Sequence, residues 1–427
     1  MRMIRDILLL QKRELEKRVT EEYVERGTAF KNGSTLIKVI LGPRRSGKSF
    51  FSAHALNKLG NFGYVNFDDE KLVEIKDYDE IVNAVNSLYN NPKYILFDEI
   101  QNLRNWEMFV NRLQRQGYNL VITGSNSKLL SKELSTHLTG RHIPITIFPF
   151  SFKEFVKIGG KELTKSEIKE KLSDYLIYGG YPEPLLKNLD YKDYLSTLFS
   201  SIIYKDIVKR FRIRLPVAIE DLATYLISNI SKEFSCNALS KAIGCKSVHT
   251  VEKYLGYLEE SFVFFRVNRF SFKLKDQMSP NNKVYCIDNG FIHAKAFKFM
   301  PEMGRLYENI VAIELLRQKL SNHNEIYYWK NQQQEEVDFA VKEGLKIKQL
   351  IQVCYNLDDI KTKEREIRAL LKAGKELRCK NLLIVTENRD AEEKAEWFGI
   401  KGRIKYVPLW KWLLQMDISL QKPQKLQ

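Results

Sequence analysis

Short apolar runs recur along the first third of the chain, and stretches with a helical period separate them. Each run is apolar on both faces, as expected for parallel strands that are buried between two layers of helices. The runs lie at 36–41, 63–67, 94–97, 120–123 and 143–148. This alternation predicts an α/β fold with a parallel sheet and crossover helices.

The pattern differs on either side of these runs. Residues 1–30 carry both charge signs at a helical spacing and predict a helical segment. Residues 151–235 are mostly helical in pattern, with a Tyr-Gly-Gly-Tyr-Pro break at 178–182. Residues 236–275 favour a helix-turn-helix followed by a β hairpin, and a mixed α/β pattern resumes at 283. At roughly 100–200 residues per domain, 427 residues allow two to four domains.

The net charge and the cysteine content limit the possible binding partners and the cellular compartment of the protein. The formal net charge is +16, which favours a polyanionic partner such as nucleic acid, although solvated Lys and Arg faces explain it equally well. No stretch approaches the roughly 18 apolar residues of a membrane span, so we expect no membrane insertion. The five cysteines form no CxxC pair, which argues against disulfides or zinc and indicates a cytoplasmic protein.

The first candidate site follows the first predicted strand, where GPRRSGKS matches the Walker A pattern GxxxxGK[ST]. The two glycines allow a tight turn whose N–H groups, with the following helix N-terminus, face phosphate oxygens. Lys48 reaches the outer phosphates, and the Ser49 hydroxyl is a ligand for Mg²⁺. We assign ATP binding to Gly42, Pro43, Arg44, Arg45, Ser46, Gly47, Lys48, Ser49 and Phe50.

A second motif lies fifty positions later, where the apolar run YILF ends in two carboxylates. This is a Walker B pattern, in which Asp98 holds Mg²⁺ together with Ser49. Glu99 then faces the attacking water as the general base. The two motifs together predict that the chain binds ATP·Mg²⁺ and hydrolyses it, with Lys48 and Glu99 as catalytic residues.

Two weaker candidates follow the fourth and precede the fifth predicted strand. Ser125 or Asn126 is placed to contact the γ-phosphate or the water as a sensor, and the alternative is an ordinary turn with a helix cap. Arg141 is placed to act as an arginine finger on the ATP of a neighbouring subunit, which would require a homo-oligomer. The alternative for Arg141 is a surface arginine.

The segments GPRRSGKS, YILFDEIQN, ITGSN, LTGR, IPITIFPFSFKEF and YLIYGGYPEPL together resemble the AAA+-like P-loop ATPases of archaea and bacteria that end in a domain of unknown function. The resemblance covers roughly 13–412. It implies an ASCE-type core, a helical lid, a winged helix and a C-terminal domain similar to PD-(D/E)xK nucleases. The predicted domains are the N-terminal helical segment at 1–30, the P-loop ATPase core at 31–155, the lid and linker at 156–215, the winged helix at 216–280 and the nuclease-like domain at 281–420.

The winged-helix segment contains the candidate DNA contacts. Its second helix would expose basic side chains opposite an apolar face, and the strand 262–267 with the segment 269–275 would form the wing. The candidate DNA-binding residues are Lys246, His249, Lys253, Arg266, Arg269 and Lys273. Because winged helices also serve as packing modules, a purely structural role is the alternative. The neighbouring basic run at 205–214 is a further candidate for DNA or nucleotide contact, or a solvated face.

The nuclease-like domain has lost part of the expected metal site. The resemblance places Glu308, Asp338 and an E-x-K motif around a metal ion, and that motif falls here on Gln352 and Cys354. Glutamine cannot supply the anionic ligand and cysteine cannot replace the ammonium, so we predict an inactive, vestigial nuclease site. Buried structural carboxylates are the alternative for Glu308 and Asp338.

The leading interpretation is an ATPase that acts on DNA as a homo-oligomer, moving its C-terminal domains along or around a duplex or junction. A nucleotide-controlled switch that binds a protein partner fits the same sequence. An ATPase-coupled nuclease is the third, weaker interpretation.

Overall fold

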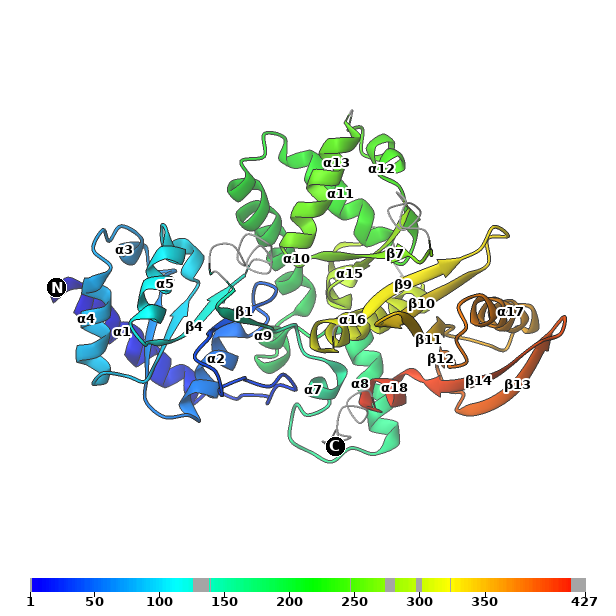
Figure 1. The fold of residues 1–427 in the computed structure, drawn as a ribbon, viewed down its shortest axis with the longest axis horizontal. Helices are drawn as coiled ribbons and strands as arrows, with labels where there is room; N and C mark the ends of the chain where they lie inside the picture. Colours follow the sequence, from blue (N-terminus) through cyan, green and yellow to red (C-terminus); the bar gives the residue numbers. More distant parts are fainter. Residues whose placement is uncertain are drawn as a thin grey trace. The chain divides into compact units, whose positions relative to one another are not determined.

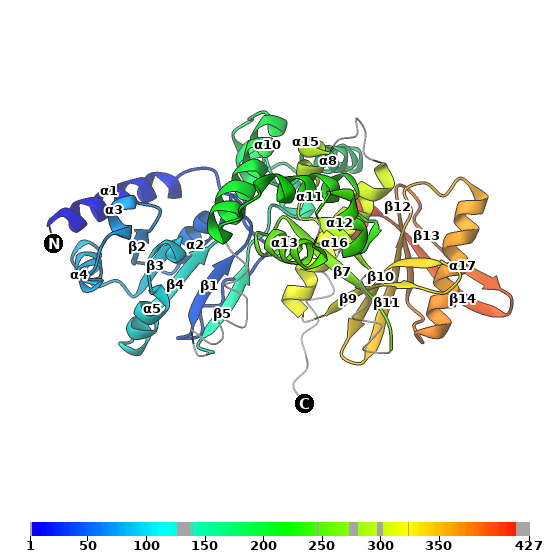
Figure 2. The same cartoon turned by 90° about the horizontal axis from the view of Figure 1, so that it is seen from above.

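The protein is described by a computed structural model covering residues 2–125, 138, 140–245, 247–272, 281–296, 302–322 and 324–415 (Figures 1 and 2). It divides into two compact units, Met1–Pro149 with Glu260–Phe262, and Phe150–Glu259 with Val263–Gln427. We describe each unit by itself. No helix in the described ranges is long and apolar enough to cross a membrane.

The first unit contains a five-stranded, entirely parallel sheet in the order β2-β3-β4-β1-β5. Its strands are β1 (Ile37–Leu41), β2 (Phe62–Asn66), β3 (Tyr94–Asp98), β4 (Asn119–Gly124) and β5 (His142–Thr146). The connecting helices are α2 (Lys48–Asn57), α3 (Glu70–Val73), α4 (Asp79–Tyr89), η1 (Ile100–Asn102) and α5 (Trp106–Arg115). Every predicted apolar run forms one strand, so the predicted parallel α/β sheet is confirmed.

The order of the strands has a chemical consequence. The strand β4 lies between β1, which leads into the Walker A loop, and β3, which ends at Asp98. Because parallel strands end at the same edge of a sheet, the end of β4 lies between the two nucleotide motifs.

The N-terminal segment belongs to the same core. It forms one helix, α1 (Arg2–Val19), which buries Ile4, Ile7, Leu8 and Leu15 in the hydrophobic core of the first unit. The Gln11 side chain exchanges two hydrogen bonds with the backbone of Asn66, at 2.9 and 3.0 Å. Residues 1–30 are therefore part of this unit's packing and not a separate module.

The second unit begins with helices, as the sequence pattern predicts. They are α7 (Phe152–Phe155), α8 (Lys165–Tyr178), α9 (Pro182–Leu186), α10 (Tyr191–Ser201), the π-helix η3 (Ile202–Lys209), α11 (Pro216–Ser228), α12 (Cys236–Ala242) and α13 (Val248–Glu260). Capping boxes at Ser151 and Thr164 fix the starts of α7 and α8.

A nine-stranded sheet in the order β13-β14-β12-β11-β10-β9-β7-β8-β6 forms the rest of this unit. The strands are β6 (Glu233–Phe234), β7 (Phe264–Arg269), β8 (Asn282–Cys286), β9 (Glu325–Lys330), β10 (Glu336–Glu343), β11 (Lys346–Val353), β12 (Leu382–Thr386), β13 (Ala391–Trp397) and β14 (Ile400–Pro408). The helices α15 (Asn289–Lys295), α16 (Met303–Asn322), α17 (Ile360–Glu376) and α18 (Leu409–Gln415) accompany it.

The strands of this sheet continue across the position at which we predicted a boundary between two domains. We expected the strand near 262–267 to pair with 269–275, but β7 pairs antiparallel with β8 and parallel with β9. Residues 273–275 lie outside the described residues. The predicted boundary at 280/281 therefore falls within one continuous sheet, because backbone pairing links β7 to strands on both sides of it.

The Tyr-Gly-Gly-Tyr-Pro break is tied to the start of the unit and to the segment after β8. Phe150 donates its N–H to the Gly180 carbonyl at 2.6 Å, and the Asp288 carboxylate accepts the N–H groups of Gly180 at 2.7 Å and Gly290 at 2.9 Å. A Cβ atom at Gly179, where φ is +72°, would clash with Asp288. The glycines are therefore required by close backbone approach.

Candidate functional site

The Walker A loop connects β1 to α2 through backbone conformations that favour glycine. Gly42 and Gly47 have φ values of +143° and +93°, and Arg45 also adopts a positive φ of 63°. A Cβ atom at Gly42 would clash with the carbonyl oxygen of Ile147. The loop then enters α2 at Lys48, so backbone N–H groups at a helix N-terminus face the place where phosphates would lie.

Two contacts from outside the motif hold this loop. The Ser46 hydroxyl donates to the Ile147 carbonyl at 2.8 Å. The buried Arg26 guanidinium donates to the carbonyl oxygens of Ser46, at 3.2 Å, and of Phe148. Arg26 thus fastens the loop to the segment after β5. No sequence motif predicts this role, because a single arginine ahead of the first strand matches no known pattern.

The Lys48 side chain is buried and folds back into its own loop. Its ammonium donates to the carbonyl oxygens of Pro43 at 2.9 Å and Gly42 at 3.2 Å. These bonds keep the charge at the centre of the loop, within reach of phosphate oxygens. The predicted position of Lys48 is compatible with its predicted role.

The Walker A and Walker B motifs meet through Ser49 and Asp98. The Ser49 hydroxyl donates to one carboxylate oxygen of Asp98 at 2.9 Å, and the Tyr64 hydroxyl donates to the other at 3.1 Å. Burial, together with the charge of Asp98, raises the pKa of Tyr64, so this phenol stays protonated as a donor. Asp98 is only 3% exposed. Ser49 and Asp98 therefore present two oxygen ligands side by side.

Thr123 links the Walker B carboxylates at the end of β4. Its hydroxyl donates to Asp98 at 2.5 Å and accepts the N–H of Glu99 at 3.0 Å. We expected a polar residue of this segment near the site, but selected Ser125 or Asn126. Ser125 is half-buried and Asn126 lies outside the described residues. Thr123 was missed although it belongs to the same motif, because strand ends cannot be placed to within two residues from sequence.

Glu99 adopts a left-handed conformation with φ of 50°, immediately after β3. Burial, opposed by the charge of Lys48 and assisted by that of Asp98, raises the pKa of its carboxyl group. The Gln101 side-chain amide donates to the same carboxylate. A carboxylate with a raised pKa next to the phosphate loop has the property expected of a general base.

Arg141 lies on the surface just before β5. Its guanidinium is within 3.5 Å of the Gln114 side-chain oxygen, and its side chain is exposed. The position is accessible to another molecule, and its action in trans stays a prediction.

The six candidate DNA contacts divide into three groups. His249 and Lys253 are exposed on α13. Arg266 bonds Glu259 at 2.7 and 2.9 Å and Glu252 at 2.8 Å, and Arg269 donates to the Lys330 carbonyl. We therefore correct the assignment of Arg266, because internal carboxylates occupy all of its guanidinium nitrogens, whereas the DNA contact of the half-buried Arg269 stays a prediction. Lys246 and Lys273 lie outside the described residues.

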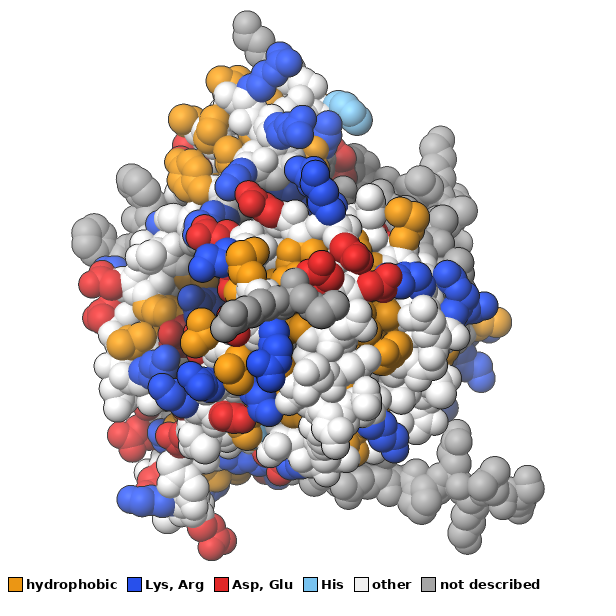
Figure 3. All heavy atoms as spheres, turned by 90° about the vertical axis from the view of Figure 1, so that its left-hand side faces the viewer, with side chains coloured by type: hydrophobic (Ala, Val, Ile, Leu, Met, Phe, Trp, Pro, Cys, Tyr) orange, Lys and Arg blue, Asp and Glu red, His pale blue; other side chains and the backbone are white. Residues whose placement is uncertain are grey.

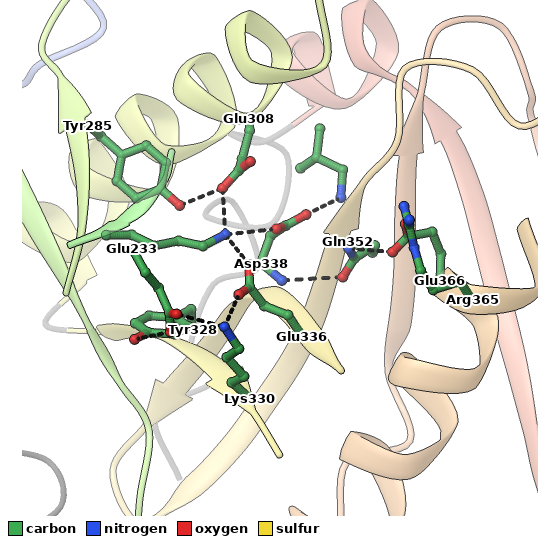
Figure 4. A network of polar contacts seen from close by, with 12 residues as sticks. Glu233, Tyr285, Glu308, Tyr328, Lys330, Glu336, Asp338, Gln352, Arg365 and Glu366 are labelled. Atoms are coloured by element: carbon green, nitrogen blue, oxygen red, sulfur yellow. Dashed lines mark hydrogen bonds and ion pairs between the residues drawn. The ribbon is translucent and has the colours of Figure 1, made fainter. Parts of the chain in front are cut away.

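The residues predicted to be a vestigial nuclease site, Glu308, Asp338 and Gln352, lie in one polar network with an unexpected lysine (Figure 4). Lys283 on β8 places its ammonium 2.9 Å from Glu308, 3.0 Å from Asp338 and 2.6 Å from Glu336. Its side chain is only 3% exposed. No group of His, Cys, Asp or Glu in the described part of the chain is arranged to hold a metal ion. The single ammonium of Lys283 offsets part of the negative charge of these three carboxylates.

The protonation of this cluster follows from its burial. Burial alone would lower the pKa of Lys283, but Glu308 and the other nearby acids raise it well above its usual value, so the lysine stays charged. Burial and the charge of Asp338 raise the pKa of Glu308 to about 8. The Tyr285 hydroxyl also donates to Glu308, at 2.7 Å.

Gln352 takes part in the same network as an uncharged bridge. Its amide oxygen accepts the N–H of Asp338 at 3.2 Å, and its amide nitrogen donates to Glu366 at 2.6 Å. Lys283 and Glu366 were missed because they come from β8 and α17, far in sequence from the expected motif.

Comparisons with known proteins agree with the first unit and identify relatives of the whole chain. An AAA domain model matches residues 34–156, and two domains of unknown function match 169–300 and 303–412. An uncharacterized protein of Methanocaldococcus jannaschii, MJ1544, is 37% identical over 398 residues, covering 88% of each chain. An uncharacterized protein of Haemophilus influenzae is 34% identical, covering 70% of this chain and 79% of its own.

Among solved structures, the Walker-type ATPase PABY2304 of Pyrococcus abyssi aligns with a TM-score of 0.41 and 16% identity. The alignment covers 60% of this chain and 90% of that chain.

Proposed function

This chain belongs to a family of AAA-domain P-loop ATPases with archaeal and bacterial members, and from that premise we propose that it hydrolyses ATP in order to act on DNA. The observation that carries the hydrolytic part is the bonded series Ser49, Asp98, Thr123 and Glu99. It joins the phosphate loop, the candidate magnesium ligands and the candidate base across three neighbouring strands.

The residues present fit ATP and Mg²⁺. The loop combines positive backbone φ values, a helix N-terminus and a buried lysine, which suits the β- and γ-phosphates. The oxygens of Ser49 and Asp98 lie 2.9 Å apart and are of the type that Mg²⁺ prefers. When bound, Mg²⁺ neutralises charge on the phosphate oxygens.

Each side chain then has a definable task. Lys48 holds the outer phosphates and stabilises the charge that develops during transfer. Glu99, with its raised pKa, takes a proton from the attacking water. Thr123 fixes the relative positions of the Asp98 side chain and the Glu99 backbone. Arg141 would supply a further positive charge from a neighbouring copy in a homo-oligomer.

The DNA part of the proposal is supported by charge and by the arrangement of α11–β8. This segment has the element order α11-β6-α12-α13-β7-β8, with its three strands in the sheet order β6-β8-β7, which is the arrangement expected of a winged helix. The exposed side chains of His249 and Lys253 lie on its second helix after β6. The net charge of +16 favours a polyanion. In this proposal the C-terminal nuclease-like part recognises the shape of DNA or contacts a protein. It does not cleave DNA, because Lys283 lies among the carboxylates that would otherwise bind a metal ion.

A protein partner is the second candidate function. Leu215 and Val217, at the start of α11, are exposed by 70% and 65% and are apolar. A nucleotide-controlled switch would use such a surface and would turn over slowly.

Glu99→Gln tests the hydrolytic part. We expect ATP binding to persist while the hydrolysis rate falls by roughly 10²–10⁴, the usual contribution of a general base. Glu70→Gln, at an exposed position on α3, is the matched control and should turn over like the native protein. Normal hydrolysis by Glu99→Gln would show that Glu99 is not the general base and would refute the proposed mechanism.

A further inference from the structure

Basic and aromatic side chains meet where Phe211, two residues after the end of the π-helix η3, stacks on Tyr257 of α13, and both residues belong to the second unit. We propose that this surface, formed by 205–214 and the exposed face of α13, binds a single strand of DNA. The inference rests on the proposed DNA function and names the site at which the strand would be held.

The first part of the surface is a dense run of cations. Residues 205–214 contain Lys205, Lys209, Arg210, Arg212 and Arg214 against one acid, Asp206, and all five cations are exposed. Two of these cations, Lys205 and Lys209, lie on the π-helix η3, and the other three follow it; the π-helix is a rare conformation that occurs frequently at functional sites. Cations concentrated in this way match the regular negative charge of a phosphate backbone.

The second part is one face of α13. His249, Lys253 and Tyr257 recur every four residues and therefore lie on one face, spanning about 12 Å at 1.5 Å per residue. The opposite face buries Val251 and Leu255 in the interior. The acids Glu252 and Glu259 of this helix both pair with Arg266, so one of their two negative charges is compensated.

Two aromatic rings join these parts. Phe211 and Tyr257 stack with ring centroids 3.7 Å apart and an angle of 9° between the planes. The Arg210 guanidinium lies 5.7 Å from the Phe211 ring centroid, and the Lys253 ammonium lies 6.0 Å from that of Tyr257. Rings interleaved with cations are the combination that single-strand binding proteins use, because cations hold phosphates while rings contact unstacked bases.

The space-filling view agrees with this distribution. Figure 3 shows Lys and Arg side chains gathered, beside a histidine, in its upper part, with few Asp or Glu side chains among them. A duplex keeps its bases stacked inside, whereas a single strand presents base faces that the outer faces of these half-buried rings can contact, which is why we assign a single strand.

The test measures binding of fluorescein-labelled oligodeoxythymidine of about 20 nucleotides, longer than the roughly 4–16 nucleotides that a single-strand binding fold occupies. The full-length protein is compared with the triple variant Lys209→Ala/Arg212→Ala/Lys253→Ala by fluorescence anisotropy over a range of salt concentrations. We expect the variant to bind at least about tenfold more weakly. The slope of log affinity against log salt should become shallower by about 2, since each phosphate contact contributes about 0.7.

The matched control is Lys375→Ala/Lys380→Ala/Lys405→Ala, three exposed lysines near β12 and β14, well removed from β7 in the order of the sheet. It should bind like the native protein, and equal thermal stability of both variants excludes misfolding. If the native protein binds and the two variants lose affinity equally, or neither does, this surface is not the site, while the DNA function stands. If the native protein binds no DNA of any form, the proposed DNA function fails as well. Binding of duplex in clear preference to the single strand would overturn the single-strand assignment.

Discussion

Removing the ammonium of Lys283 should lower the free energy of unfolding of the second unit, because this ammonium lies among buried carboxylates. The substitution Lys283→Met keeps a similar side-chain length and deletes the charge. In the native structure this ammonium contacts three carboxylates at 2.6–3.0 Å, and Asp338 and Glu308 are only 8% and 13% exposed. Without the lysine, Glu308 and Asp338 would face each other with no ammonium between them, whereas Glu336 would keep Lys330 at 3.7 Å.

The expected loss follows from the cost of unpaired buried charge. Deleting one partner of a buried ion pair destabilises a protein by about 3–5 kcal/mol. The loss should be larger at pH 9 than at pH 6, because Glu308 ionises beside the lysine with a pKa of about 8 in the native protein, whereas the variant must either keep this acid protonated at pH 9 or bury an unpaired charge. It should shrink towards pH 6, because protonation of the cluster relieves the repulsion.

The assay is urea unfolding of the native and variant proteins, followed by circular dichroism at both pH values. A Mn²⁺ titration of the variant adds a second readout, because a divalent cation can neutralise the vacated cluster and should raise the unfolding midpoint. The native protein, whose lysine already neutralises the cluster, should not respond. Lys348→Met is the control, because its ion pair with Glu343 is mostly exposed and such pairs contribute about 0–1 kcal/mol.

Two results would refute this reasoning. A destabilisation of Lys283→Met below about 1 kcal/mol at pH 9 would mean that the cluster needs no cation. Equal stabilisation of the native protein by Mn²⁺ would mean that metal binds despite the lysine.

Three further predictions address other parts of the molecule. Thr123→Val should lower ATP turnover by up to about 10²-fold, since a small displacement of catalytic groups has that effect, while rapid-filtration binding of ATP changes little. Arg26→Met removes the hydrogen bonds that Arg26 donates to the carbonyl oxygens of Ser46 and Phe148, so we expect the free energy of unfolding to fall by about 1–3 kcal/mol and the KM for ATP to rise; Lys58→Gln, which breaks an exposed pair, should change neither. Burial raises the pKa of Asp288 from 3.8 to about 7, although hydrogen bonds from two backbone N–H groups oppose this rise. Between these two values the folded protein keeps a proton that the unfolded chain has lost. The free energy of unfolding should therefore fall as pH rises from about 4 to about 7. Asp288→Asn should flatten that part of the profile of melting temperature against pH, and an unchanged slope would assign it to other groups.

Much of the first unit could be predicted from sequence because its strands are buried on both faces. Such strands appear as continuous apolar runs, and the P-loop requires particular residues at fixed spacing. Lys48, Ser49, Asp98 and Glu99 lie together as their motifs indicate.

The residues that were missed or misassigned depend on contacts distant in sequence. Arg26 reaches Phe148 across 122 positions, and Lys283 reaches Asp338 across 55. The positive charge of Arg266 is evident from the sequence and suggests a DNA contact. The sequence does not indicate that two carboxylates of the same unit pair with this arginine. Charge counts identify cations but do not identify which of them are already neutralised within the fold.

The most direct test of the central claim is steady-state ATP hydrolysis by the pure protein with single-stranded, duplex and branched DNA, and without DNA. An ATPase that acts on DNA should hydrolyse ATP faster with at least one DNA form, and this increase should disappear in Glu99→Gln. Turnover that stays the same with every DNA form would contradict the proposed action on DNA and favour the switch that binds a protein partner.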